Sequence, residues 1–393
     1  MFRNLKIGRK LILLGLVFSV PVAVLLFLLI KEQNIAIDFG QNERRGVEYI
    51  KPVRHLLQDI QKHQVAFLGG AGEAASLERQ IEEDLRSAQE VDGRYGKDLK
   101  TTHGLSGLAE KWTTTKSLIL RSSSNAKPEA INSAYDDIVG KSILPLIIQA
   151  GDTSQLILDP DLDSYYAMDN VVLNLPALGQ LIAQTNAHVA DLILTRENME
   201  SKKQLISFLL ARIEPTMDRL NTGLQTSINE NPSLRGKLAL PLRTHVEAMK
   251  AFDDMIRRQV LDAGPSEFAK LDLKSMSANG MKALESNYAM YDVALGVLDD
   301  LLVTRIGNFN QRRTISLGIV SVSVALAALF VFSIGRSISG PIAELKEVTD
   351  RINKGDLSTS PDMDRRDEIG QLASAISRLQ KTLQSGGKMK AAA

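Results

Sequence analysis

Residues 315–334 read ISLGIVSVSVALAALFVFSI, a run that contains no charged side chain. A second uncharged run, LILLGLVFSVPVAVLLFLLI, occupies residues 11–30. A helix of about 20 residues rises about 30 Å, which matches the hydrocarbon thickness of a bilayer. The two runs therefore predict two transmembrane helices, with residues 31–313 on one side of the membrane and the segment from Arg336 onward on the other.

The charges that precede the first run predict its orientation. They are all basic, namely Arg3, Lys6, Arg9 and Lys10. Because basic flanks stay in the cytoplasm, residues 1–10 are expected to be cytoplasmic and residues 31–313 to lie outside. The alternative is a cleaved signal peptide, but the run is long for that role and no small-x-small cleavage site follows Ile30.

Composition excludes several classes of protein. The formal net charge is +1 and no basic stripe interleaved with aromatic residues occurs, so no nucleic-acid partner is expected. The chain has no cysteine, which excludes disulfides, zinc-thiolate sites and thiol catalysis. No serine-histidine, paired-carboxylate or phosphate-loop pattern is found, so we expect no catalytic residue, cofactor or metal and no enzymatic activity within these residues.

The region 31–313 is expected to be helical throughout, which makes the protein all-α. Apolar residues keep a helix period at Leu205, Leu209, Ile213, Leu220 and Leu224, and no strand-like alternation competes. A coiled-coil-like seam leads toward the second run through Leu284, Tyr288, Tyr291, Leu295, Leu298 and Leu302. Breaks are predicted at 69–72, 94–107, 122–128, 229–233 and 264–265. They favour a long up-and-down bundle, or two bundles stacked end to end along the membrane normal.

One segment places carboxylates at alternate positions, as the opening of a calcium-binding loop does. They are Asp159, Asp161 and Asp163. The sixth position is Ser164 instead of Gly and the twelfth is Asn170 instead of Glu. A helix boundary with Asp159 or Asp163 as the N-cap is therefore favoured over a metal site.

A ligand contact is also conceivable in this region. Arg54 lies within an apolar stripe of the first outer helix. If it faces the interior beside Tyr165 or Tyr166, it could bind the carboxylate of a small organic acid. The alternative is an ordinary solvated helix face.

The segment after Pro341 contains two short heptad patterns joined by a polar connector. The first has Ile342, Leu345, Thr349 and Ile352; Gly355-Asp356-Leu357 follows; and Asp367-Glu368-Ile369-Gly370 opens the second, with Leu372, Ile376, Leu379 and Leu383. Neither pattern could hold a core alone, whereas two copies of the chain could form a parallel four-helix bundle. This arrangement resembles the HAMP linker of bacterial receptors. The resemblance covers residues 336–384 and leaves 385–393 as a flexible tail.

The resemblance implies a homodimer and assigns roles to residues. Lys346, Arg351, Arg378 and Lys381 are expected to face water. Glu368 is expected to reach back toward Pro341 and set the relative position of the two helices, unless it is only a favourable acid at a helix start. The residues expected to relay the signal are Pro341, Ile342, Leu345, Ile352, Leu357, Glu368, Ile369, Leu372, Ile376 and Leu379.

The outer region has a looser resemblance. Residues 46–52, His63-Gln64 and residues 156–168 look like the helical sensor region of some methyl-accepting chemotaxis proteins, among them the helical bimodular type. This implies a multi-pass protein of the bacterial inner membrane, with both termini cytoplasmic and residues 31–313 periplasmic. It would sense a small molecule or a periplasmic binding protein.

A chemoreceptor, or its input half, is the expected function. The alternatives are the input half of a histidine kinase or diguanylate cyclase, and a structural membrane-anchored bundle without a ligand. Residues 385–393 contain no output module, so a downstream signalling module or protein is implied. The sequence leaves open whether that module lies beyond Ala393.

Overall fold

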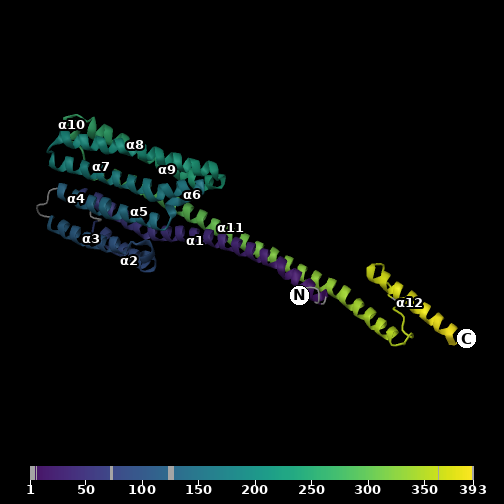
Figure 1. The fold of residues 1–393 in the computed structure, drawn as a ribbon. Coiled ribbons are helices and arrows are strands. Elements are labelled where there is room, and N and C mark those ends of the chain that lie inside the picture. The colour runs from purple at the N-terminus through teal and green to yellow at the C-terminus, as the bar shows by residue number, and fades with distance from the viewer. Residues whose placement is uncertain (1–4, 6, 71–73, 123–127, 362, 392–393) are drawn as a thin grey trace. The chain divides into compact units, whose positions relative to one another are not determined.

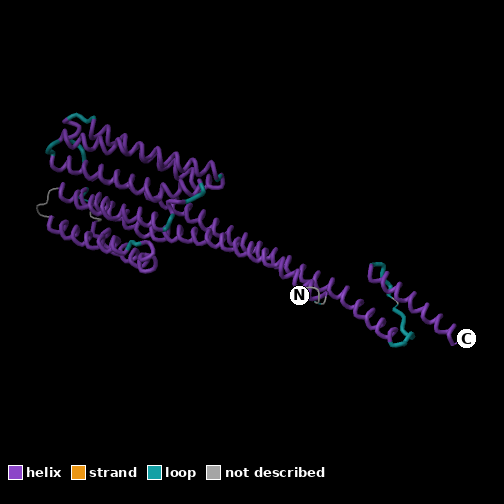
Figure 2. Tube along the Cα trace, viewed as in Figure 1, coloured by secondary structure: helices purple, strands orange, loops and turns teal. Residues whose placement is uncertain are grey.

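The computed structural model describes residues 5, 7–70, 74–122, 128–361 and 363–391. Within these residues every regular element is a helix (Figure 2), which confirms the all-α prediction. The chain divides into two compact units. One is residues 36–309, called here the outer unit, and the other combines residues 1–35 with 310–393.

The outer unit is a bundle whose chain runs back and forth along its length (Figure 1). Each traverse, called a pass here, is one helix or several helices in line. A first group contains α1 (Ile7–Leu68), α2 (Ala74–Leu99), α3 (Thr102–Ser122), α4 (Pro128–Ile138), the π-helical turn Val139–Ile143 and α5 (Leu144–Thr153). A second group contains α6 (Leu162–Asp169), the π-helical turn Asn170–Asn174, α7 (Leu175–Thr195), α8 (Met199–Glu230), α9 (Arg235–Ile256), α10 (Pro265–Phe268) and α11 (Leu273–Asn353). Short helical turns at Leu156–Leu158, Pro232–Leu234 and Arg257–Leu261 complete the unit.

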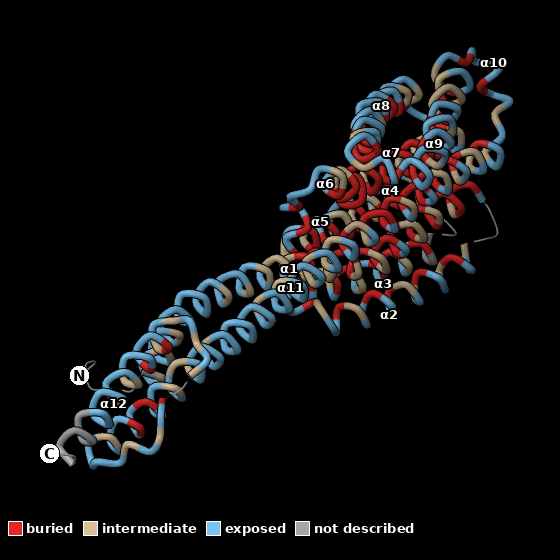
Figure 3. Tube along the Cα trace, turned by 90° about the vertical axis from the view of Figure 1, so that its right-hand side faces the viewer, coloured by how far each residue is buried: buried red, intermediate tan, exposed pale blue. Residues whose placement is uncertain are grey.

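The two groups lie side by side in both Figure 1 and Figure 3, so of the two arrangements that the sequence leaves open, the end-to-end stack does not form. Stacking would need helices that run through both bundles. Instead each pass is short; α2 has 26 residues and α8 has 32, which corresponds to about 40–48 Å. Passes of similar length that reverse at each end can only lie abreast.

Two prolines in the outer unit lie just after a widened helical turn. Pro145 and Pro176 each follow a π-helical turn, at Val139–Ile143 and Asn170–Asn174. Proline has no N–H and its ring crowds the preceding turn, so a widened turn lets the helix go on. Each π turn thus joins two short helices into one pass.

The core of the outer unit follows the predicted seam on α11, and the buried positions are coloured red in Figure 3. All six seam residues from Leu284 to Leu302 are at most 5% exposed, which confirms that prediction. The stripe on α8 is buried except at its first residue, because Leu205 is 39% exposed.

A chain of polar side chains crosses this apolar core. The Tyr288 hydroxyl donates to Gln61 Oε1 over 2.6 Å, and Gln61 Nε2 donates to Gln180 Oε1 over 3.2 Å. Gln180 Nε2 then donates to Asp136 Oδ1 over 2.9 Å. The chain links α11, α1, α7 and α4, so it fixes the register of both groups at once.

The second unit contains the two apolar runs. Parts of α1 and α11 are long and apolar enough to cross a membrane, with 18-residue windows of mean hydropathy 2.9 and 2.5. None of either window is buried in the structure, as expected of a surface that faces lipid. Arg3 and Lys6, on which part of the predicted orientation rests, lie outside the described residues.

The unit ends in α12 (Glu368–Ala391). Helix therefore continues to Ala391 where the sequence predicts a flexible tail from residue 385, because Lys388, Met389, Lys390 and Ala391 are good helix formers. Residues 392–393 lie outside the described residues, as do 71–73 and 123–127 within two predicted breaks.

A buried ion pair at the turn between α7 and α8 gives a stability prediction. Lys202 Nζ lies 2.8 Å from Asp191 Oδ2, and their side chains are 9% and 1% exposed. Lys202→Met leaves a buried carboxylate without a cation and should cost about 3–5 kcal/mol of unfolding free energy. The measurement is denaturation of the full chain in detergent. The double variant Asp191→Leu/Lys202→Met should recover most of the loss.

The control is the exposed pair Lys237–Asp300, whose side chains are 56% and 65% exposed. Lys237→Met should cost less than about 1 kcal/mol. Equal losses for Lys202→Met and Lys237→Met would show that the buried pair has no special role.

Candidate functional site

Arg305 on α11 is the centre of an ion cluster in the outer unit. Its Nη1 lies 3.0 Å from Glu43 Oε2 on α1, and its Nη2 lies 2.5 Å from Asp159 Oδ1. Its Nε lies 2.7 Å from Asp161 Oδ2, and Nη2 also donates to the Ser164 hydroxyl. The guanidinium thereby joins α1, α11 and the connection between α5 and α6; these five residues are called the Arg305 cluster below.

The local backbone explains why these side chains meet. A Cβ added at Gly40 would lie 2.9 Å from Ile306 Cγ1, so the glycine allows α1 and α11 to approach closely one turn before Glu43. Asp159 Oδ1 accepts the backbone N–H of Asp161 over 3.0 Å and the Ser164 hydroxyl over 2.9 Å. The connection is thus folded around the same carboxylate that Arg305 contacts.

The acidic segment is a helix boundary, as the sequence favours, but its N-cap residue differs from the predicted ones. Asp159 and Asp161 contact Arg305, while Asp163 accepts a hydrogen bond from Asn231 Nδ2 over 2.9 Å, so the three carboxylates do not converge. The N-cap position of α6 belongs to Asp161, and no side chain caps the helix there. The predicted N-caps Asp159 and Asp163 are therefore wrong, because Arg305 and Asn231 compete for these acids.

The electrostatics of the cluster are unbalanced. Three carboxylates surround one guanidinium, and Glu43 is fully buried. Burial, followed by the nearby Asp159 carboxylate, raises the pKa of Glu43 to about 8 against the opposing effect of Arg305. Burial also raises the pKa of Asp159. The site therefore favours a bound proton near neutral pH.

Arg54, the predicted ligand contact, is buried but occupied by partners within the chain. Its Nη2 lies 2.7 Å from Asp292 Oδ2 and 3.0 Å from the Tyr288 carbonyl oxygen. Its guanidinium carbon also lies 5.1 Å from the centre of the Tyr288 ring and 5.8 Å from that of Tyr291. A carboxylate ligand would have to displace Asp292.

The two predicted tyrosine contacts lie elsewhere. Tyr165 and Tyr166 contact each other on α6 with ring centroids 5.3 Å apart, and Tyr166 lies beside Gly223 of α8. Neither Tyr165 nor Tyr166 is among the described contacts of Arg54. The structure thus does not bring the three predicted ligand residues together.

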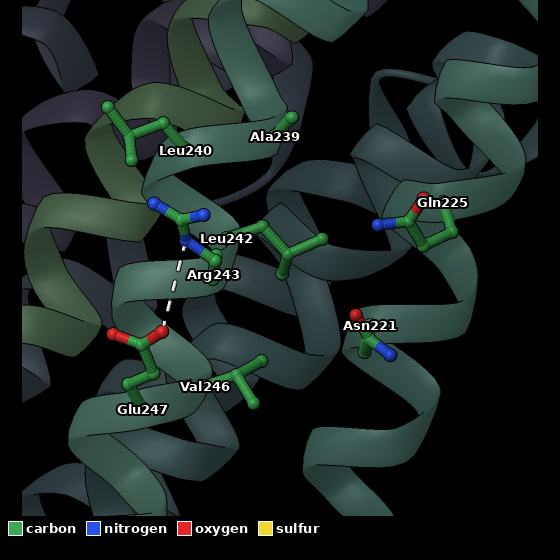
Figure 4. Close-up of a pocket in the computed structure, with 8 residues that line it drawn as sticks. All are labelled: Asn221, Gln225, Ala239, Leu240, Leu242, Arg243, Val246 and Glu247. Atoms are coloured by element: carbon green, nitrogen blue, oxygen red, sulfur yellow. Dashed lines mark ion pairs between the residues drawn. The ribbon is translucent and has the colours of Figure 1, made fainter.

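A surface groove of about 720 Å³ runs between α8 and α9 (Figure 4). Exposed Leu240 and Val246 provide its apolar part, and Arg243 pairs with Glu247 at 3.9 Å. None of the predicted site residues lines it. The remaining lining residues are Asn221, Gln225, Ala239 and Leu242.

Sequence reasoning missed Glu43 and Arg305. A signal was present for Arg305, because the seam of α11 steps from Leu298 to Leu302 by four and would next step by three to position 305. A charged residue at a seam position indicates a buried polar contact. Its acidic partners cannot be read from spacing, since they lie more than 140 positions away.

The segment after the second apolar run has an apolar stripe that its own chain does not cover. Leu345 is buried, but Leu372, Leu379 and Leu383 are 52%, 58% and 47% exposed. Ile342 is also exposed, and Ile352, Leu357, Ile369 and Ile376 are half-buried. Within one chain, therefore, Leu345 is the one predicted interior residue of this set that is fully covered.

The connector before α12 is fixed by Arg365. Its Nη1 donates to the Ser337 carbonyl oxygen over 2.9 Å, and its Nη2 pairs with Asp367 Oδ2 at 2.5 Å. Asp367 Oδ1 in turn accepts the Gly370 N–H over 3.1 Å at the start of α12. Glu368 lines a groove with Ile338, Ile342 and Arg365. The contact back to α11 that was predicted for Glu368 is thus made by Arg365.

The family model of the HAMP domain matches residues 333–385. These residues form a HAMP domain. The match confirms the resemblance drawn from the connector and the two heptad patterns. Among curated proteins, the chain is 33% identical over 84 residues to the signal transduction histidine-protein kinase BaeS of Escherichia coli (strain K12). The alignment covers 21% of this chain and 18% of the kinase. No solved structure matches the chain.

The unbalanced charge of the Arg305 cluster predicts a pH-dependent effect of mutation. Arg305→Met removes the cation from the buried carboxylates and should cost about 3–5 kcal/mol of unfolding free energy at pH 8. The loss should shrink at pH 5, because protonated carboxyl groups need no cation. Denaturation of the full chain in detergent at both pH values measures it.

Arg258→Met is the matched control, since its side chain is 78% exposed and lies 3.7 Å from Asp254. It should change stability by less than about 1 kcal/mol at either pH. If Arg305→Met lowers the unfolding free energy equally at pH 5 and pH 8, the claim that the cluster has an excess of negative charge is wrong.

Proposed function

We propose that the chain is the input part of a homodimeric receptor in a bacterial inner membrane. The outer unit, on the periplasmic side, responds to a small molecule or a periplasmic binding protein, and the HAMP domain passes the response to a cytoplasmic output. The observation that carries the proposal is the continuity of α11. This single helix of 81 residues supplies Arg305, the second apolar run and the first helix of the HAMP domain.

A continuous helix is a suitable relay because it transmits rotation and axial displacement without a hinge. A stimulus can shift an equilibrium only if it binds the two states differently. The Arg305 cluster provides contacts that can differ between states, because it ties α11 to α1 and to the α5–α6 connection. The HAMP domain then acts as the two-state element that reads the position of α11.

The homodimer is supported by the exposed apolar stripe of the HAMP domain. Leu372, Leu379 and Leu383 recur at spacings of seven and four, as in a coiled-coil seam, and remain exposed in one chain. A second copy would bury the same stripe in a symmetric parallel bundle. The relay roles of Ile342, Leu345, Ile369 and Ile376 depend on that assembly.

The output class is a finer part of the proposal. The sequence favours a chemoreceptor, through the resemblance of the outer helices to chemotaxis sensors. A histidine kinase output is the second candidate, and the 84-residue similarity to BaeS favours it. The chain spans about a fifth of that kinase. In either case no catalytic step is assigned to the residues of this chain.

A chimera tests whether the outer unit controls the output. Residues 1–385 are fused to a heterologous kinase output and expressed in membranes. Arg305→Met should shift the basal output several-fold in one direction, because it removes the tie between α11 and α1. Lys282→Met, an exposed site on the same helix, should leave the output unchanged. Equal outputs from the two variants would contradict the proposal.

The same chimera tests the HAMP seam. Leu372→Glu places a charge in the predicted dimer core and should lock or abolish the output, because burying an unpaired charge costs several kcal/mol. Lys346→Glu changes an exposed side chain and should have little effect. If Lys346→Glu locks the output while Leu372→Glu leaves it unchanged, the seam assignment is wrong.

A further inference from the structure

We infer that the Arg305 cluster is a proton-operated latch between α1 and α11. A proton bound to one of the buried carboxylates keeps the latch closed, and its loss at alkaline pH opens the latch and displaces α11. The inference rests on the proposed function, because it names the proton as a stimulus that the outer unit can convert into helix motion.

The charge count in the cluster carries the inference. Asp161 is 56% exposed, so water screens its charge. Glu43 and Asp159 are buried, and among the described residues the cation paired with both is Arg305, whose side chain is 11% exposed. Two buried carboxylates against one guanidinium leave one negative charge in excess. A buried unpaired charge is costly enough that the group neutralises instead, and one proton is sufficient.

Two buried carboxylate oxygens in the cluster are candidate positions for the bound proton. Glu43 Oε1 and Asp159 Oδ2 are buried, and neither has a hydrogen-bond partner. Ionised carboxylates can only accept, whereas a protonated carboxyl also donates. A proton on one of these oxygens therefore removes the excess charge. A metal ion is a poorer fit, because no three acidic or histidine side chains in the described part of the chain are placed to hold one.

The groups around Glu43 are few. From α11 it faces Arg305, and the carboxylates of the α5–α6 connection that act on it are Asp159 and Asp161. The raised pKa of Glu43, about 8, agrees with this environment. A neighbouring carboxylate, Asp299, is a useful contrast.

Asp299 lies 2.8 Å from Arg44 and 2.7 Å from Lys51. It therefore has two cations and needs no proton. The excess of negative charge in the Arg305 cluster therefore does not extend to Asp299.

The sign of the pH dependence follows from the raised pKa. The folded protein binds the Glu43 proton more tightly than the unfolded chain, so the stabilisation is complete below the ordinary pKa of a glutamate. It decreases as the pH rises toward about 8 and is constant above that value. Gly40, one turn before Glu43, lets α1 pack against Ile306, so ionisation of Glu43 acts beside a close contact between the two helices.

A distance measurement on the full chain in lipid nanodiscs tests the latch. The chain has no cysteine, so Gln41→Cys and Asn308→Cys place spin labels at two exposed sites beside the cluster without background. Electron-spin distance distributions are recorded from pH 6 to pH 9.5. The distribution should shift or broaden with a midpoint near pH 8. Glu43→Gln, which mimics the protonated acid, should keep the low-pH distribution throughout.

Asp38→Asn is the matched control, because it removes an exposed carboxylate from the same helix. It should titrate as the unsubstituted protein does. A flat response of the unsubstituted protein, or an unchanged transition in Glu43→Gln, would overturn the latch. Neither result would contradict the proposed function. That proposal fails only if substitutions in the outer unit leave the kinase output of the chimera unchanged at every pH.

Discussion

A buried guanidinium must be surrounded by anions, and in this protein that requirement ties together three segments that are distant in sequence. Arg305 contacts Glu43 on α1 and Asp159 on the α5–α6 connection, so the end of the outer unit is held by one side chain of α11. Because the carboxylates outnumber the guanidinium, the strength of these contacts depends on whether one carboxyl group is protonated. They are strong when one carboxyl is protonated and weak when it is not. A contact of this kind suits a protein that must move.

The outer unit and the HAMP domain are held together by different means. In the outer unit each apolar face is covered by another part of the same chain, and polar links such as Tyr288–Gln61–Gln180 specify the register of the helices. In the HAMP domain the seam residues Leu372 and Leu379 remain exposed. The outer unit therefore has its own core, whereas the HAMP domain as proposed depends on a second copy. The two-state element that we propose is therefore the HAMP domain.

Much of the architecture could be predicted from the sequence because it depends on local patterns. Length and hydropathy identified the two apolar runs, helix period identified the seam from Leu284 to Leu302, and the connector with Asp367-Glu368 identified the HAMP domain. The arrangement of the outer helices could not be predicted, since stacked and side-by-side bundles have the same breaks. The candidate site was missed for a related reason: Arg305 and its partners meet only through long-range packing, and Arg54 is neutralised by Asp292.

The account claims that the state of the Arg305 cluster reaches the HAMP domain through α11. The most direct measurement is disulfide crosslinking in membranes of single cysteines introduced in turn from Ile369 to Leu379, which is unambiguous because the chain has no cysteine of its own. The account predicts crosslinking with helical periodicity, and a different set of efficient positions when Arg305→Met is added. An identical crosslinking pattern with and without Arg305→Met would contradict it.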